Sequence, residues 1–137
     1  MGDCSFFLMP IGDFISLLCE KGEDKNMLQK RFKKDAASLS TLYEIIKKVD
    51  ELGYKEGMDF AYNAHYIAPI AAHGNLSLIE IRVRNELWRV LAYHSLQRKH
   101  LVMLDAFENH KGVTMNEMVE RVKQKRSIAK ELLKEVD

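Results

Sequence analysis

The sequence predicts an α+β fold in which a small antiparallel β-sheet is accompanied by N-terminal helices and a C-terminal helix. Residues 77–111 contain three consecutive strand patterns separated by short polar turns. Apolar side chains recur at helical spacing before these strands, and a helix N-cap signal with an apolar stripe follows them. At 137 residues the chain has the size of one domain, so residues 1–137 are expected to form a single domain.

The three strands are predicted from alternation and composition. In residues 78–84 the apolar Ile79, Ile81 and Val83 alternate with charged side chains, which is the period of a half-buried strand. Residues 87–94 follow a short polar break and are rich in aromatic and aliphatic side chains, so the two segments predict a hairpin. Residues 100–107 form a nearly continuous apolar run, typical of a strand covered along most of its length.

The segments before these strands carry weaker signals. Residues 5–9 predict a short strand that Pro10 ends, and a helical pattern then runs from Gly12 to a stop at Gly22. Residues 24–52 have apolar side chains at helical spacing, and they predict either one long helix or two helices separated at residues 38–41, with Ser40 as a possible cap.

The next segment and the C-terminus differ in how clearly they can be interpreted. Residues 53–75 lack clear periodicity and predict either a functional loop or a loop that holds further structure, with a short strand expected near residues 62–67. Residues 114–137 predict a helix, because Thr114 and Glu117 form a capping-box pattern in front of a regular apolar stripe.

Composition restricts the classes of function. The net charge is only +1, so a nucleic-acid partner would have to be held by a local basic patch. Cys4 and Cys19 are too few for a disulfide framework, and no spacing of histidines and carboxylates resembles a metal site, so we expect no metal or cofactor. The absence of a signal peptide or membrane-spanning stretch at the N-terminus favours a reduced, cytoplasmic protein.

Three motifs in the strand region occur together in one known superfamily. They are Leu78-Ile79-Glu80-Ile81-Arg82, Trp88-Arg89-Val90-Leu91-Ala92-Tyr93 and Val102-Met103-Leu104-Asp105-Ala106-Phe107. Together with the order of two helices, a loop, three strands and a helix, they make the chain resemble the RelE/HigB superfamily of small bacterial toxins. The phage-derived HigB-like branch is the most similar, and the resemblance covers residues 39–134.

The resemblance implies a compact antiparallel sheet with helices against one face, and a concave basic surface that engages mRNA in the ribosomal A site. Active members cleave RNA without a metal ion, and a cognate antitoxin covers the basic surface. In this reaction the ribose 2′-hydroxyl attacks the adjacent phosphate. The protein must therefore orient the RNA backbone, stabilise the charged phosphorane and move protons.

The resemblance also implies which residues form the site. Arg82, Arg89 and His110 are the expected catalytic residues, because arginine holds phosphate oxygens with a planar, permanently charged fork and histidine titrates near neutral pH. The expected RNA-binding residues are Arg84, Lys111, Arg98 and Lys99. Since Arg82 and Arg84 are two positions apart on a predicted strand, we expect both side chains on the same face.

Several alternatives stay open. Glu108 and Asn109 stand where the superfamily usually has basic residues, which favours a toxin-fold protein that has lost nuclease chemistry and serves as a binding module for protein or nucleic acid. A gyrase-poisoning relative is a third possibility.

The arginines could also form a solvated sheet face paired with Glu80 and Glu86. His65 could stack on bases or close its loop onto the sheet, and the interleaved charges of residues 117–135 predict an ordinary solvated helix face.

Overall fold

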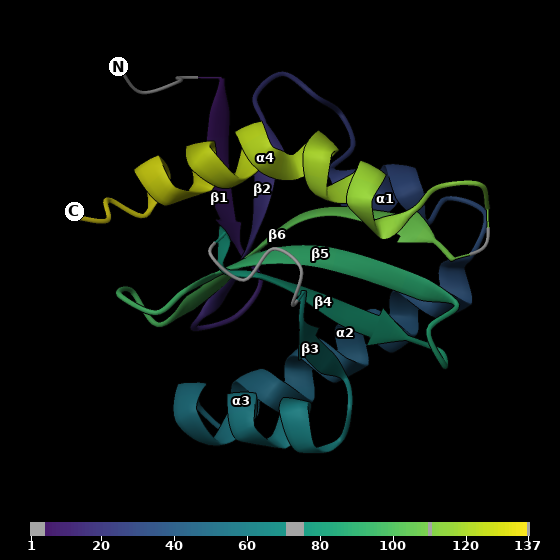
Figure 1. Ribbon diagram of the computed structural model, residues 1–137, viewed down its shortest axis with the longest axis horizontal. Helices are drawn as coiled ribbons and strands as arrows, with labels where there is room; N and C mark the ends of the chain where they lie inside the picture. Colours follow the sequence, from purple (N-terminus) through teal and green to yellow (C-terminus); the bar gives the residue numbers. More distant parts are fainter. Residues whose placement is uncertain (1–4, 71–75, 110, 137) are drawn as a thin grey trace.

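A computed structural model describes residues 5–70, 76–109 and 111–136. Helices lie on both faces of a six-stranded mixed sheet, which makes an α+β fold (Figure 1). The strands are ordered β1-β2-β6-β5-β4-β3, and all neighbouring pairs are antiparallel except β2 and β6, which are parallel. In chain order the elements are β1 (Phe6–Pro10), β2 (Ile15–Glu20), α1 (Met27–Arg31), α2 (Ala36–Glu51), α3 (Tyr54–Asn63), β3 (Ile67–Pro69), β4 (Leu78–Val83), β5 (Trp88–Ser95), β6 (His100–Glu108) and α4 (Met115–Leu132).

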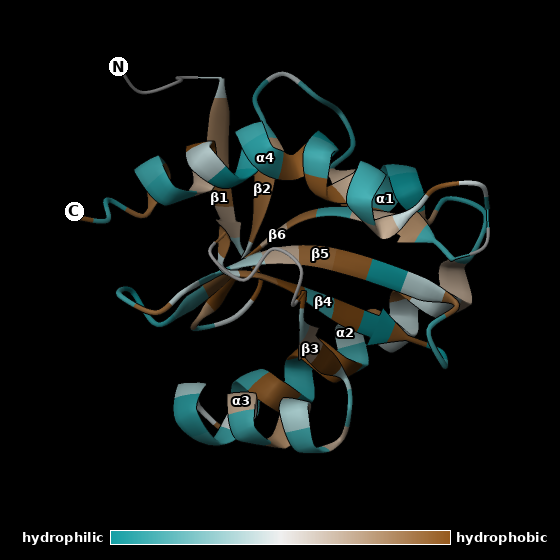
Figure 2. Cartoon of the chain, in the orientation of Figure 1, coloured by the Kyte–Doolittle hydropathy of each residue, from teal (hydrophilic) through white to brown (hydrophobic). Residues whose placement is uncertain are grey.

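Each face of the sheet has its own hydrophobic core. Helices α1, α2 and α3 cover one face, where Phe32, Leu42 and Met103 are almost completely buried. Helix α4 covers part of the other face, where Leu91, Val119 and Val122 are buried. Figure 2 shows hydrophobic and hydrophilic residues alternating along α4, as expected of a helix with one buried side. The resemblance implied helices on one face only, and in this respect the expectation was wrong.

The three strands predicted for residues 78–107 are confirmed as β4, β5 and β6, which form consecutive antiparallel pairs. The strand predicted at residues 5–9 is confirmed as β1. The sheet as a whole is larger than predicted and is mixed, because β2 pairs in parallel with β6 through Ile15 and Leu101, Ser16 and Val102, and Leu17 and Met103.

The helix predicted between Gly12 and Gly22 was wrong, because this segment contains β2. All residues of β2 except Glu20 are buried. A strand covered on both faces has a continuous apolar run, which periodicity alone cannot distinguish from a buried helix. Gly22, with a φ of 85°, marks the end of a strand rather than of a helix.

Residues 24–52 form two helices, so the broken form was correct, but the break lies at residues 32–35 and Ser40 lies inside α2. Asp35 is the N-cap of α2, and its carboxylate accepts hydrogen bonds from the amide (3.1 Å) and hydroxyl (2.6 Å) of Ser38. The indole of Trp88 also donates to this carboxylate at 2.8 Å. The cap is therefore fixed by β5 as well as by its own helix.

Residues 53–70 hold further structure, which was one of the two alternatives for this segment, and it includes a helix that the sequence did not predict. Helix α3 occupies Tyr54–Asn63, and the short strand β3 begins only at Ile67, so the strand expected near residues 62–67 was misplaced. Gly57 allows α3 to approach α2 closely, because a Cβ at this position would lie 2.2 Å from the carbonyl oxygen of Val49. Residues 71–75, also part of the expected loop, lie outside the described residues.

The C-terminal helix is confirmed, with Thr114 as its N-cap, although it ends at Leu132 rather than continuing to Asp137. The Thr114 hydroxyl accepts a hydrogen bond from the Glu117 amide at 3.1 Å. Among the described helices, none is both long and apolar enough to cross a membrane.

Candidate functional site

Arg82 on β4 and Arg89 on β5 lie directly opposite each other in the register of the hairpin. Their side chains are 32% and 24% exposed, so both are partly accessible to solvent. Like charges at facing positions of two strands repel each other and destabilise the pair. The fold must therefore compensate for placing two guanidinium groups at this point.

Two carboxylates provide this compensation. Glu80, on β4, is almost fully buried, and it lies 2.7 Å from Arg82 Nε and 3.4 Å from Arg89 Nη1. Glu86, in the β4–β5 turn, lies 3.4 Å from Arg82 and 3.2 Å from Arg89. The hydrogen bond to Glu80 raises the pKa of Arg82. The sequence-based alternative is thus confirmed for the pairing of Arg82 and Arg89 with Glu80 and Glu86, but Glu80 is buried rather than solvated and Arg84 pairs with Asp35 instead. The four charges of Glu80, Arg82, Glu86 and Arg89 sum to zero.

One donor of this cluster remains unused. The Nε atom of Arg89 is buried and has no hydrogen-bond partner among the described residues. A buried donor without an acceptor costs free energy, and native proteins contain few of them. The arginine–glutamate cluster, defined here as Glu80, Arg82, Glu86 and Arg89, therefore contains one buried donor that no described residue satisfies.

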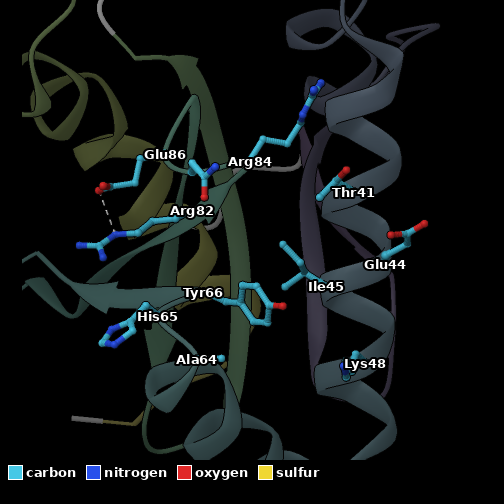
Figure 3. A pocket seen from close by; sticks show the side chains of 11 residues that line it. Thr41, Glu44, Ile45, Lys48, Ala64, His65, Tyr66, Arg82, Arg84 and Glu86 are labelled. Carbon is cyan, nitrogen blue, oxygen red and sulfur yellow. Dashed lines mark ion pairs between the residues drawn. The ribbon is translucent and has the colours of Figure 1, made fainter.

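Arg84 does not share a face with Arg82, so that expectation was wrong. Arg84 follows the last residue of β4, and positive φ angles at three consecutive turn residues (52° at Arg84, 55° at Asn85, 66° at Glu86) end the alternation of the strand. Its guanidinium points toward α2, whereas that of Arg82 points toward Glu86 (Figure 3). Arg84 lies 3.7 Å from the carboxylate of Asp35, whose pKa is lowered mainly by its hydrogen bonds with Ser38 and Trp88.

His65 is a candidate that the sequence did not place. It is exposed, and Figure 3 shows its imidazole on the same side of β4 as the side chain of Arg82. The two segments are adjacent because the Arg82 amide donates to the carbonyl oxygen of Tyr66 at 2.7 Å. Without α3 and β3, which sequence periodicity did not predict, nothing indicated that His65 would reach this hairpin.

A hollow of about 560 Å³ lies between α2 and the edge of the sheet, and of the arginine–glutamate cluster only Arg82 and Glu86 line it. Ile45 and Tyr66 supply apolar surface, and Lys48, Arg84 and Glu44 add charge of both signs. Its other lining residues are Thr41, Ala64, His65, Arg82, Asn85 and Glu86. The hollow is large enough for part of a nucleotide.

The remaining predicted site residues fall into two groups. Lys111 is exposed, lies 4.0 Å from Glu108, and follows the end of β6 next to the start of β5. It is therefore at the same end of the sheet as Arg89. His110 lies outside the described residues, so its predicted catalytic role stays a prediction.

Arg98 and Lys99 lie in the β5–β6 turn, which follows the end of β5 that is farther from Arg89. At 3.3 Å per residue, the strand separates Arg89 from this turn by roughly 20 Å. The guanidinium of Arg98 donates to the carbonyl oxygen of Lys134. Gln97 holds the Val136 backbone through two hydrogen bonds of 2.7 and 2.8 Å. This turn thus binds the segment after α4 and does not join the arginine–glutamate cluster.

Other candidates have structural roles. His94 is half-buried and its Nε2 lies 2.7 Å from the Tyr54 hydroxyl, and burial lowers its pKa. Trp88 and Phe107 are buried in the core. Several α4 cations have intramolecular partners, which fits an ordinary helix face: Lys123 pairs with Glu120, Lys125 with Asp105, and Arg126 with the Leu76 carbonyl.

Within residues 5–70, 76–109 and 111–136, no group of three or more histidine, cysteine or acidic side chains is placed to hold a metal ion. No protein-family model matches this chain, and no curated protein is significantly similar to it.

Proposed function

We propose that this chain is the toxin component of a type II toxin–antitoxin pair, and that it cleaves mRNA on the ribosome. The observation that carries the proposal is the facing pair of Arg82 and Arg89. A sheet built only for stability would place opposite charges at these positions. Two partly exposed guanidinium groups side by side instead suit a ligand that offers several anionic oxygens, such as a phosphodiester.

The arrangement of elements also supports the proposal. The RelE/HigB-like motifs lie on β4, β5 and β6, which are the three consecutive antiparallel strands. Helices precede these strands in the chain, and α4 follows them and packs on the sheet. Glu80 belongs to the first motif, so its pairing with both arginines is compatible with membership of this superfamily.

The proposed reaction needs no group beyond side chains and the RNA itself. The 2′-hydroxyl forms a bond to the adjacent phosphorus and the bond from phosphorus to the 5′-oxygen breaks, leaving a 2′,3′-cyclic phosphate and a 5′-hydroxyl. Arg82 and Arg89 stabilise the charge of the phosphorane. His65, whose imidazole lies on the same side of β4 as the side chain of Arg82, would take the proton from the 2′-hydroxyl or donate one to the leaving oxygen.

The test is direct. Inducible expression should arrest growth, and co-expression of the neighbouring small open reading frame should relieve the arrest if it encodes the antitoxin. Purified protein should cleave mRNA in the presence of ribosomes and leave cyclic phosphate ends. Intact mRNA at high protein concentration, together with normal growth of the expressing cells, would exclude the nuclease function.

Glu86 should compete with the RNA phosphate for the arginines. Unlike Glu80, it lies on a turn and its side chain is 44% exposed, so its replacement should leave the fold intact. We expect Glu86→Gln to raise affinity for a short single-stranded RNA by roughly 3- to 10-fold at low salt, the size expected for one partly screened charge. Fluorescence anisotropy measures this change.

The control for this experiment is Glu56→Gln, which removes an exposed carboxylate from α3. If both variants bind RNA equally well, the gain in RNA affinity reflects net charge alone, and Glu86 does not compete with a bound phosphate.

A second candidate function is a toxin-fold module that binds its partner without cleaving RNA. It is favoured by the pairing of three of the four predicted site arginines, Arg82, Arg84 and Arg89, with carboxylates at 2.7 to 3.7 Å. The neutral cluster offers little attraction to an approaching phosphate. RNA or antitoxin binding without cleavage, with Glu86→Gln also inactive, would favour this function.

A further inference from the structure

Strand β1 (Phe6–Pro10) forms an edge of the sheet that is open to pairing. It stands at one end of the strand order, and among the described residues only β2 pairs with it. Residues 5–12 contain no charged side chain, although natural proteins usually protect an exposed edge with charges, bulges or a very short strand. The opposite edge follows this rule, because β3 has only three residues and ends at Pro69. Of the two edges, that of β1 is therefore the one that can receive another strand.

The hydrogen bonds to β2 determine which backbone groups of β1 face outward. The Ile11 amide donates to the Ile15 carbonyl oxygen at 2.8 Å. In an antiparallel pair every second residue makes such bonds, so the residues at even steps back from Ile11 also bond to β2. The amides and carbonyls of Phe6 and Leu8 therefore point away from β2. The carbonyl of Pro10 does so too, but proline has no amide hydrogen to offer.

Apolar side chains accompany this free backbone. Phe7 is 40% exposed, and on the same side of the strand Met9 and Ile11 are only partly buried. Tyr43 of α2 is also partly exposed, and its pKa is raised by burial and by the nearby Cys19, which is the residue opposite Phe7 in the β1–β2 register. Phe7 and Tyr43 thus belong to one apolar surface that borders the open edge.

We propose that two copies of this chain associate through β1, which pairs antiparallel with the β1 of the second copy about a two-fold axis at Leu8. In this register the two Leu8 residues exchange both of their outward hydrogen bonds. Each Phe6 amide donates to the carbonyl oxygen of the partner's Pro10, so every outward amide of β1 finds an acceptor. Phe7 lies directly opposite the partner's Met9, in a position where cross-strand side chains are in contact.

The composition of β1 favours a second copy over a strand of another kind. Because residues 5–12 carry no charge, two copies of this segment do not repel each other. A strand with charged side chains would have to desolvate them against Phe7 and Tyr43, which costs free energy. A two-fold interface also closes on itself and leaves neither β1 edge exposed.

This inference does not depend on the proposed function. Strands β2 and β6 separate β1 from β5 and β4, which hold Arg89 and Arg82. The two sheets would join into one continuous sheet, and the arginine–glutamate cluster of each copy would stay outside the interface.

Sedimentation equilibrium of three proteins tests the association. The wild type should have twice the chain mass of 15.9 kDa. Phe7→Lys should weaken dimerisation by about tenfold, because each dimer loses two contacts between Phe7 and the partner's Met9. The matched control is Leu87→Lys, which changes a side chain of nearly equal exposure, 39%, in the β4–β5 turn. It should dimerise like the wild type.

Hydrogen exchange of individual backbone amides, followed by NMR in the wild type, tests the register and requires no variant. The outward amides of Phe6 and Leu8 should exchange slowly at high protein concentration and faster on dilution, because only the dimer protects them. The amides of Phe7 and Met9 bond to β2 and should be protected at every concentration.

Three results would overturn the inference. The first is a wild type that stays monomeric at millimolar concentration. The second is a dimer in which the Leu8 amide exchanges freely, which would assign the association to another surface. The third is protection of the Leu8 amide only after the neighbouring gene product is added, which would assign the edge to a strand of a different chain. None of these results involves mRNA cleavage, so the proposed function would stand or fall separately.

Discussion

Arg89→Ala should lower ribosome-dependent mRNA cleavage by about 100- to 1,000-fold, the effect of removing one preorganised donor from a site of developing negative charge. Arg89 faces Arg82 across the β4–β5 hairpin and its side chain is 24% exposed, so the variant removes one half of the guanidinium pair on which the proposed function depends. Cleavage rates at saturating ribosome-bound mRNA measure the loss, and thermal melting verifies that the variant is folded. Glu80 keeps its 2.7 Å contact with Arg82 in this variant, which limits the damage to the cluster.

Two variants make this result interpretable. Arg98→Ala removes the same kind of side chain from the β5–β6 turn, at the other end of β5, where Arg98 binds the Lys134 carbonyl, and this variant should cleave at nearly the wild-type rate. Arg89→Lys keeps the charge but loses the planar fork, and should remain strongly impaired. Equal rates for Arg89→Ala and Arg98→Ala would contradict the assignment of the site to the β4–β5 hairpin.

The sequence predicted β4 to β6 well because each of them carries its own local signal. Alternation in β4 and the apolar run in β6 do not depend on distant residues. In contrast, β2 has a run that suits a helix or a strand equally well, and only its pairing with β6 decides between them. Similarly, the start of α2 depends on a hydrogen bond from Trp88, which is 53 residues away in the chain.

In the candidate site, too, the sequence predicted only those features that carry a local signal. Sequence spacing correctly put Arg82 and Arg89 on neighbouring strands, but it assumed that β4 continued through Arg84. Three consecutive positive φ values redirect the turn, so Arg84 reaches Asp35 instead. The contribution of His65 depends on α3 and β3, whose pattern was not periodic. Residues brought together by irregular backbone were therefore those that the sequence could not place.

Arg31→Met should lower the free energy of unfolding by about 2 kcal/mol at pH 7, because it leaves a buried carboxylate short of its main partner. Asp105 is only 3% exposed, and Arg31 donates to its two oxygens at 2.8 and 3.2 Å. Lys125, at 3.6 Å, would be the one cation left near it among the described residues. We place the loss below the usual range for buried pairs because the Arg31 side chain is 50% exposed. Chemical denaturation measures the change.

Lys30→Met is the matched control, since it makes the same change one residue away. Its partner Glu23 is 44% exposed and can be solvated by water, so the loss should be no more than about 0.5 kcal/mol. Asp105→Asn should also cost less than Arg31→Met, because the cations that it leaves unpaired are at least partly exposed. Equal losses of unfolding free energy in Lys30→Met and Arg31→Met would mean that the burial of Asp105 does not increase the cost of removing its partner.

The pH dependence of Arg31→Met provides an independent test of the same contact. Burial alone would raise the pKa of Asp105, but the Arg31 hydrogen bonds, the charge of Lys125 and the Ala106 amide outweigh it and lower this pKa. A lowered pKa stabilises the fold above the unfolded value of about 4, and this stabilisation is lost as the pH falls through the folded value. Without Arg31 the pKa rises, so the variant loses less stability in acid. The difference in the free energy of unfolding between wild type and Arg31→Met should therefore become smaller from pH 7 to pH 3. A difference that stays constant over this range would show that Arg31 acts through packing rather than through the charge of Asp105.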